Sequence, residues 1–146
     1  MKYPIIIGLM LSAGWWHGPG DPADGWDVFA KVKFTEKLSK EDNTYYLYPF
    51  FDSRIRAYEG KVFELRGHYL PMDFNDPRVV IVSKFPSSTC FFCGGAGPAS
   101  VAEVYLKTKP PKLKADQIVT IKGILYLNDK DIEHMNFILK DATLIK

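Results

Sequence analysis

The feature of the sequence that most constrains its fold is a glycine at the centre of two long alternating segments. Residues 117–127 place Val119, Ile121 and Leu125 on one face around Gly123, and a two-residue apolar period is typical of a half-buried strand. Gly67 interrupts residues 61–69 in the same way. A glycine inside a strand permits a sharp bend or bulge, which strands of a closed barrel need more than strands of a flat sheet. The two segments therefore favour a twisted barrel.

Three further segments complete a set of five predicted strands. Residues 79–85 form a compact β-branched run, and residues 101–107 alternate apolar side chains with Glu103, Tyr105 and Lys107. In residues 137–144 the alternation slips by one position across Lys140 and Asp141, as a β-bulge would produce. We therefore predict a mainly β protein, a small five-stranded barrel similar to an OB-fold. Another small barrel or a sandwich remains the alternative.

Two structured segments are expected before the barrel. Residues 26–34 alternate apolar and charged side chains, which predicts a half-buried strand, with a helix as the alternative. Residues 52–60 predict a short helix directly before the first barrel strand, with Asp52 or Ser53 as its N-cap. The charged residues 37–43 predict a solvated loop. The aromatic residues after this loop are expected in the barrel core: Tyr45, Tyr46, Tyr48, Phe50 and Phe51.

The first residues of the chain predict export. Lys2 precedes about ten mostly apolar residues, a length that suits the core of a signal peptide and is too short to span a membrane. We therefore predict a signal peptide and irregular lead-in over residues 1–25 and a single domain over residues 26–146, in a periplasmic or secreted protein without a membrane span in the mature domain. An apolar first strand is the alternative for the leading residues.

The charge balance argues against a polyanionic partner. The chain contains 19 Lys and Arg residues and 17 Asp and Glu residues, a net charge of +2. Proteins that bind nucleic acid, the usual ligand class of OB barrels, carry a larger basic excess. We expect an unknown protein or small-molecule ligand, and we do not expect nucleic acid.

Cys90 and Cys93 form the motif that could carry chemistry. Two thiolates at this spacing can hold one tetrahedral ion, either zinc or copper. His134, in the predicted connection between the last two strands, is the preferred third ligand, and His68 and Asp73 are further candidates. The glycines that follow could turn their backbone amides toward bound sulfurs: Gly94, Gly95 and Gly97.

Other interpretations of the cysteine pair stay open. The pair could form a disulfide or remain reduced, or it could act as a redox dithiol. The glycines oppose a helix after Cys93, and such a helix usually lowers the thiol pKa in dithiol oxidoreductases. We therefore expect a binding or assembly module more than an enzyme. A metal-binding protein and a dithiol redox protein are the two alternatives, and no cofactor other than zinc or copper is indicated.

The segment Cys90–Pro98, which reads Cys-Phe-Phe-Cys-Gly-Gly-Ala-Gly-Pro, resembles an uncharacterised family of short exported bacterial proteins. The run from Gly67 to Pro71 and the closing residues 136–139 fit the same family. The resemblance covers nearly all of residues 26–146. It implies an OB-like exported domain with no assigned activity, and it identifies no catalytic residue.

Overall fold

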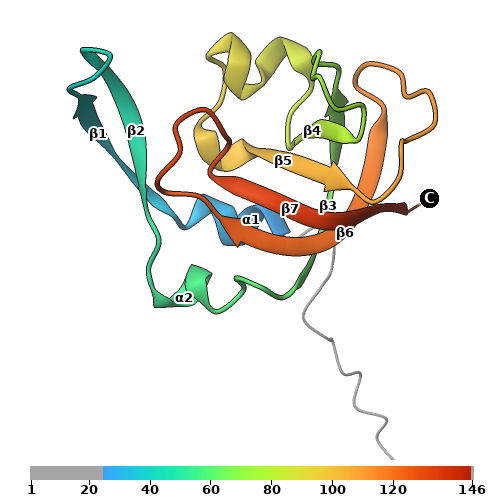
Figure 1. The fold of residues 1–146 in the computed structure, drawn as a ribbon, viewed down its shortest axis with the longest axis horizontal. Coiled ribbons are helices and arrows are strands. Elements are labelled where there is room, and N and C mark those ends of the chain that lie inside the picture. Colours follow the sequence, from blue (N-terminus) through green and yellow to red (C-terminus); the bar gives the residue numbers. More distant parts are fainter. Residues whose placement is uncertain (1–24, 146) are drawn as a thin grey trace, which may run out of the picture.

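Five strands close into a barrel in the computed structural model, which describes residues 25–145 (Figure 1). Around the barrel the strands follow the order β3-β4-β5-β7-β6, and β3 pairs with both β4 and β6. This order confirms the predicted mainly β, five-stranded OB-like barrel. The five barrel strands are β3 (Val62–Leu70), β4 (Val79–Ser83), β5 (Val101–Leu106), β6 (Ile118–Leu127) and β7 (Phe137–Ile145).

The strand pairings explain why the sheet closes. Neighbouring strands are antiparallel except for β5 and β7, which pair in parallel. The last strand thus returns between the third and fourth barrel strands, which is the Greek-key arrangement of an OB-fold. Closure leaves no free edge in the barrel, so any edge open to a partner must lie elsewhere.

At the two predicted glycines a neighbouring strand lies too close for a Cβ atom. At Gly123 a Cβ atom would lie 2.9 Å from both the Ala142 Cβ and the Lys140 carbonyl oxygen. The register between β6 and β7 also shifts beside this glycine, and Asp141 opposite has a φ of 49°. At Gly67 a Cβ would collide with the Ser83 carbonyl oxygen. The slip in the last strand is therefore confirmed, and at both glycines the neighbouring strand leaves no room for a side chain.

The first described element is a helix, α1 (Gly25–Ala30), rather than the strand predicted over residues 26–34. The helical alternative is correct because Trp26 and Phe29, three positions apart, are the residues that become buried. The Phe29 ring stacks on Phe63 and Phe137, with ring centroids 5.1 and 3.9 Å apart. These rings belong to the first residues of β3 and β7, so α1 covers that end of the barrel.

A two-stranded hairpin extends away from the barrel at the left of Figure 1. It consists of β1 (Lys33–Ser39) and β2 (Thr44–Phe50), so the loop predicted over residues 37–43 shrinks to a turn at residues 40–43. The prediction of a buried aromatic cluster is also wrong, because Tyr45 and Phe50 are 70% and 64% exposed. Phe51 does pack against the core, whose space is otherwise filled by α1 and the barrel strands.

Helix α2 (Ser53–Arg56) connects the hairpin to β3 and is shorter than the predicted 52–60. Asp52 caps it as expected, because its side chain accepts hydrogen bonds from the backbone N–H groups of Arg54 and Ile55. The turn after α2 ends at Gly60, whose φ of 77° favours glycine. No helix within residues 25–145 is long and apolar enough to cross a membrane. The predicted signal peptide and lead-in lie outside the described residues except for Gly25.

Candidate functional site

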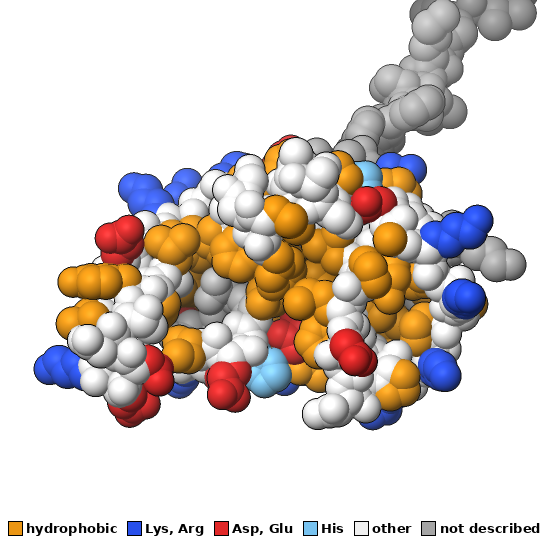
Figure 2. Space-filling model, turned by 90° about the horizontal axis from the view of Figure 1, so that it is seen from above, with side chains coloured by type: hydrophobic (Ala, Val, Ile, Leu, Met, Phe, Trp, Pro, Cys, Tyr) orange, Lys and Arg blue, Asp and Glu red, His pale blue; other side chains and the backbone are white. Residues whose placement is uncertain are grey.

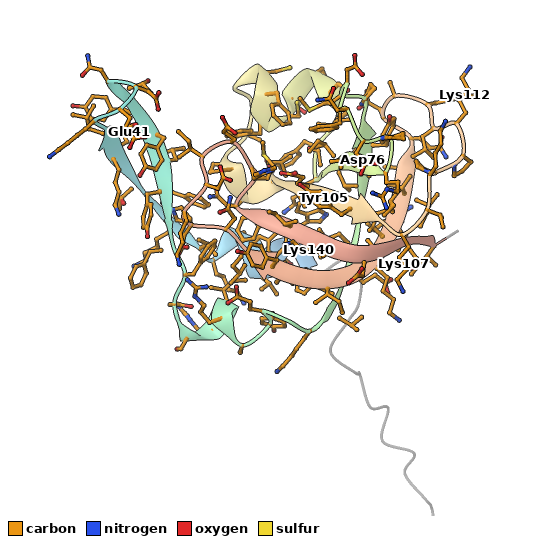
Figure 3. All side chains as sticks on the ribbon, viewed as in Figure 1. Glu41, Asp76, Tyr105, Lys107, Lys112 and Lys140 are labelled. Atoms are coloured by element: carbon orange, nitrogen blue, oxygen red, sulfur yellow. The ribbon has the colours of Figure 1, made fainter. Side chains whose placement is uncertain are left out.

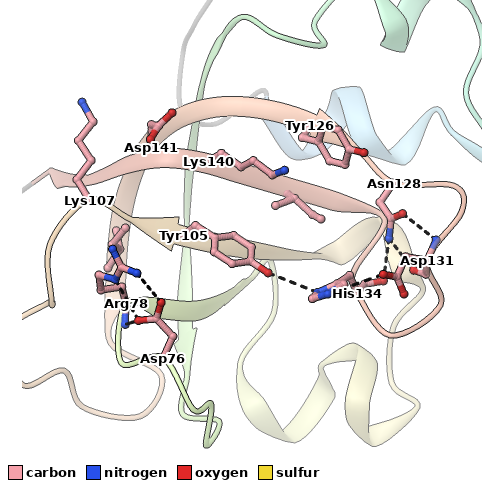
Figure 4. Close-up of a pocket in the computed structure, with 12 residues that line it drawn as sticks. Asp76, Arg78, Tyr105, Lys107, Tyr126, Asn128, Asp131, His134, Lys140 and Asp141 are labelled. Atoms are coloured by element: carbon pink, nitrogen blue, oxygen red, sulfur yellow. Dashed lines mark hydrogen bonds and ion pairs between the residues drawn. The ribbon is translucent and has the colours of Figure 1, made fainter.

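A groove of about 670 Å³, called groove 1 below, runs over the outer surface of β5, β6 and β7 (Figure 4). The β3–β4 loop closes one side and the β6–β7 loop, residues 128–136, closes the other. In an OB-fold, the loops that correspond to these two border the ligand-binding surface, which lies on the second and third strands. Groove 1 includes the third strand, β5, but no residue of the second, β4, lines it. The residues that line groove 1 are Asp76, Arg78, Tyr105, Leu106, Lys107, Tyr126, Asn128, Asp131, His134, Ile138, Lys140 and Asp141.

Tyr105 lies in groove 1 with its hydroxyl group directed toward His134 (Figure 4). The hydroxyl donates to Glu103 Oε1 over 2.6 Å and lies 3.4 Å from His134 Nδ1. Burial, together with the hydrogen bond to Glu103, raises the pKa of Tyr105 to about 12. The hydroxyl thus stays a proton donor to Glu103, and the ring is what Tyr105 contributes to the groove.

Glu103 is a buried carboxylate that holds this part of the site together. Besides the Tyr105 hydroxyl, it accepts hydrogen bonds from His134 Nδ1 at 2.9 Å and from the Met135 backbone N–H at 3.0 Å. The hydrogen bond to Glu103 raises the pKa of His134. Because its bonds all go to protein groups, Glu103 positions β5 and the β6–β7 loop and is not directed at a ligand.

The sequence did not identify Glu103 as part of a site. It was one of three polar residues expected on the outer side of its strand, and outward polar residues are ordinarily solvated. The sequence feature that could have identified Glu103 is the run of Glu103, Tyr105 and Lys107 on one face of β5. His134 was identified, as a metal ligand, but the structure places its Nδ1 atom against Glu103.

The charges that line groove 1 balance. The basic residues are Arg78, Lys107 and Lys140, and the acidic residues are Asp76, Asp131 and Asp141, which makes three of each. The Arg78 guanidinium forms a paired contact with the Asp76 carboxylate, at 3.1 and 2.8 Å. The Lys140 ammonium lies over the Tyr126 ring, 4.1 Å from its centroid. Groove 1 is therefore polar. Its Asp, Arg and Lys side chains together carry no net charge, and His134, whose pKa is raised, adds a positive charge when it is protonated.

The β6–β7 loop is held in place by Asn128. Its buried side-chain amide donates to the Asp131 carbonyl oxygen over 2.7 Å, and its side-chain oxygen accepts from the Asp131 backbone N–H over 3.0 Å. Arg56 of α2 also contacts Asp129 at 2.8 Å. These bonds fix the backbone that carries His134 into the site.

The two cysteines lie in the β4–β5 connection, which is built from three short turns of 3₁₀-helix. Cys90 is buried in an apolar cluster outside the barrel, and Cys93 is exposed. Both thiols are free, with their Sγ atoms 3.9 Å apart, and the Cys93 thiol donates to the Ser87 carbonyl oxygen over 3.0 Å. The contact with Cys90 raises the pKa of Cys93.

The other predicted ligands are not gathered around these sulfurs. His68 Nδ1 lies 3.3 Å from the Asp116 carbonyl oxygen, and Asp73 forms no hydrogen bond with any described residue. Within residues 25–145, no three side chains of His, Cys, Asp or Glu are grouped as a metal site would require. Zinc or copper binding by Cys90 and Cys93 remains a prediction.

The glycines after Cys93 use their amides differently from the expectation. The backbone N–H groups of Gly94 and Gly95 donate to the carbonyl oxygens of Phe91 and Cys90, not to sulfur. Gly94 has a φ of 74°, and a Cβ at Gly95 would lie 2.8 Å from the Thr89 carbonyl oxygen. A Cβ at Gly97 would meet no atom within 4 Å. Gly94 and Gly95 therefore serve the tight turn of the loop.

Comparison with known proteins adds no relative to this description of the site. No protein-family model, curated protein or solved structure matches the chain. The family resemblance carried by Cys90–Pro98 consequently remains a prediction. What the chain binds has to be inferred from the geometry of its own residues.

Proposed function

We propose that the protein is a binding module that holds an uncharged, hydroxyl-rich chain, such as a segment of an oligosaccharide, in groove 1. The observation that carries the proposal is the Tyr105 ring, fixed by its hydroxyl group and surrounded by balanced charges. A sugar ring binds to an aromatic face through its C–H groups, while its hydroxyl groups need both donors and acceptors nearby. Groove 1 offers acceptors on its Asp residues and donors on Arg78 and its Lys residues.

Two other classes of ligand, a phosphate backbone and an apolar molecule, fit groove 1 less well. A phosphate backbone would meet as many acidic as basic side chains in this groove, and polyanion binding depends on a local basic excess. An apolar ligand would desolvate six charged side chains without replacing their hydrogen bonds. The OB-fold itself supports the proposal by analogy only, because this fold serves both oligosaccharides and nucleic acids.

Export is part of the proposal, and the apolar residues near the N-terminus support it. Oligosaccharide polymers are abundant outside the cytoplasm, so an exported protein would meet its ligand there. N-terminal sequencing of the protein recovered outside the cytoplasm tests this part. Recovery of the uncleaved chain from the cytoplasm alone would contradict it.

The binding test is an NMR titration of the ¹⁵N-labelled protein with three probes: an oligomer of N-acetylglucosamine, an oligomer of glucose, and a short oligothymidylate as the anionic comparison. We expect at least one of the neutral oligomers to shift the amide signals of Tyr105, His134 and Arg78 at millimolar concentration. Tyr105→Ala should remove the shifts. The control Tyr45→Ala changes an exposed tyrosine on the hairpin, outside groove 1, and should not affect them. Binding of oligothymidylate without either oligosaccharide would refute the proposal.

A second candidate function is supported by the cysteine pair. The exposed Cys93 thiolate could attack a disulfide such as oxidised glutathione and release one glutathione thiolate. Cys90, whose Sγ lies 3.9 Å away, would then attack the Cys93 sulfur, which forms the Cys90–Cys93 disulfide and releases the second glutathione. The raised pKa of Cys93 lowers its thiolate fraction at neutral pH, which ranks this function second.

A further inference from the structure

A second groove, called groove 2, has a volume of about 330 Å³ and separates the hairpin from the barrel. Strand β2 forms one wall and the β6–β7 loop forms the other, while Phe91 and Pro98 of the β4–β5 connection also line it. Figure 2 shows a hollow beside the hairpin, at the left, with hydrophobic side chains around it. Groove 2 is distinct from groove 1, although Asp131 and His134 of the loop border both.

The wall that β2 forms is the free edge of this strand. Five consecutive residues, 45–49, line groove 2, whereas no residue of β1 does. If a face of the hairpin lined the groove, alternate residues of β2 would do so together with their cross-strand partners in β1. Within residues 25–145, the backbone of β2 forms hydrogen bonds with β1 alone. Strand β2 therefore presents backbone N–H and C=O groups that no described residue pairs.

Along residues 44–48, this edge lacks the charged side chains and prolines that usually protect an edge strand. Residues 44–50 contain no charged side chain, whereas β1 carries Lys33, Glu36 and Lys37. Charged residues and prolines are the common means of preventing another strand from pairing at an edge. Pro49 blocks pairing only near the base of the hairpin, where it lies opposite Phe34. Residues 44–48 therefore have no strand paired with this edge among residues 25–145.

We propose that groove 2 takes one extended segment of a partner protein, which adds to β2 as a third strand. Recognition of this kind combines main-chain hydrogen bonds with pockets for alternate side chains. An isolated two-stranded hairpin is only marginally stable in water, and a third strand would complete the sheet. Five residues of added strand would cover about 17 Å along residues 44–48.

The surroundings of groove 2 indicate the chemistry of this segment. Leu47 and Ile132, on opposite walls, are 43% and 55% exposed, so apolar side chains of the segment would find contacts on both sides. The β6–β7 loop contains three acidic residues and a single lysine, Lys130. Of these three acids, Asp129 and Asp131 line groove 2. Arg56 pairs with Asp129, and within residues 25–145 the Asp131 carboxylate contacts no cationic group except the His134 ring, at 3.9 Å, so Asp131 is the acid that would attract a base. The partner segment should therefore alternate apolar and basic residues.

The position of the free edge disfavours a second copy of this chain as the occupant. The edge of β2 faces the protein's own β6–β7 loop, so groove 2 has a wall on each side. In a second copy the same edge would be flanked by that copy's barrel, and pairing two β2 edges would bring the two barrels into collision. A single strand without a folded domain on its other side avoids this collision. In Figure 3 the hairpin tip, which carries Glu41, extends beyond the barrel at the end of the molecule opposite Lys112.

The test uses the full chain and a short synthetic peptide in which lysine and valine alternate. Binding is measured by NMR, through intermolecular contacts between the peptide and the amides of residues 44–48, and by fluorescence anisotropy of the labelled peptide. We expect the peptide to bind at this edge. We also expect binding to weaken about tenfold or more when alternate peptide nitrogens are methylated, because methylation removes the main-chain donors. A peptide of alternating glutamate and valine should bind more weakly than the lysine peptide.

Two matched variants locate the site. Ile132→Ala removes an apolar contact in groove 2 and should weaken peptide binding, whereas Leu38→Ala changes a comparably exposed residue of β1 outside the groove and should not. Equal binding of the methylated peptide, or no binding of the lysine peptide, would overturn the proposal. A concentration-dependent dimer that Ile132→Ala dissociates would assign the groove to a second copy instead. NMR contacts from residues 1–24 to residues 44–48 would assign it to the protein's own N-terminal segment.

Discussion

The substitution Glu103→Gln tests whether the buried carboxylate holds the β6–β7 loop against β5. Glu103 accepts three hydrogen bonds: two at Oε1, from Tyr105 and His134, and one at Oε2, from the Met135 backbone. In glutamine an amide nitrogen replaces one of these oxygens. If it replaces Oε2, it faces the Met135 N–H group, and an unsatisfied buried donor costs about 1–3 kcal/mol. If it replaces Oε1, every group can be paired, but the bonds become neutral and lose about 1–2 kcal/mol in total.

Either orientation lowers the free energy of unfolding by about 1–3 kcal/mol, and the loss should depend on pH. The contact with Glu103 raises the pKa of His134 above its ordinary value of 6.5. A histidine with a raised folded-state pKa contributes stability that is fully present below pH 6.5 and is lost as the pH rises through the folded-state pKa. The difference between wild type and Glu103→Gln should therefore be larger at about pH 5.5 than at about pH 8.5. Because the His134 side chain is 43% exposed, solvent screening keeps this pH-dependent part below about 1 kcal/mol.

Urea unfolding followed by circular dichroism at both pH values measures these differences, and NMR titration of the His134 ring should show its pKa falling in the variant. Glu64→Gln is the matched control, because Glu64 is a partly buried residue of β3 whose side chain forms no hydrogen bond with a described residue. The control should change stability by less than about 0.5 kcal/mol. A Glu103→Gln variant as stable as the control, or a difference that grows with rising pH, would refute the account of this pair.

Three further predictions follow from the same structure. Gly123→Ala should destabilise the protein by about 1–3 kcal/mol because its Cβ would press on the β7 backbone, whereas Gly97→Ala should change stability by less than about 0.5 kcal/mol in the same urea experiment. The difference in ultraviolet absorption between wild type and Tyr105→Phe should show that Tyr105 ionises near pH 12, and ionisation near pH 10 would contradict its burial and its bond to Glu103. Iodoacetamide should alkylate Cys93 in the native protein and Cys90 only after unfolding, while equal rates for both would contradict the burial of Cys90.

The barrel could be predicted because its signals are local. Alternation within each strand, Gly67, Gly123 and the slip near Lys140 are visible in short windows of sequence, and each has a direct steric meaning in the structure. The helix α1 could not be chosen over a strand with the same certainty, since residues 26–34 fit both periods. Tertiary packing decides between helix and strand, because the Phe29 ring of the helix fills the open end of the barrel between the first residues of β3 and β7.

The candidate sites were harder to predict because they depend on contacts between distant segments. Glu103 and His134 are 31 positions apart, and they meet because β5 and β7 pair in parallel, which brings the loop before β7 beside β5. The exposure of Tyr45 has a similar origin. An aromatic strand is ordinarily assigned to a core, and its exposure here follows from the barrel interior being already filled.

The filled interior also determines where a ligand can bind. Phe29, Leu65 and Ile121 are completely buried inside a closed barrel whose end is covered by α1, so the barrel offers its outer surface only. The outer surface of a strand forms a groove only where a neighbouring loop or hairpin rises beside it. In this protein the β6–β7 loop lies between grooves 1 and 2 and borders both. The conformation of that loop depends on the side-chain hydrogen bonds of Asn128 and of Glu103, which belongs to β5. Binding at both grooves should therefore be more sensitive to these two polar residues than to any conservative change in the core.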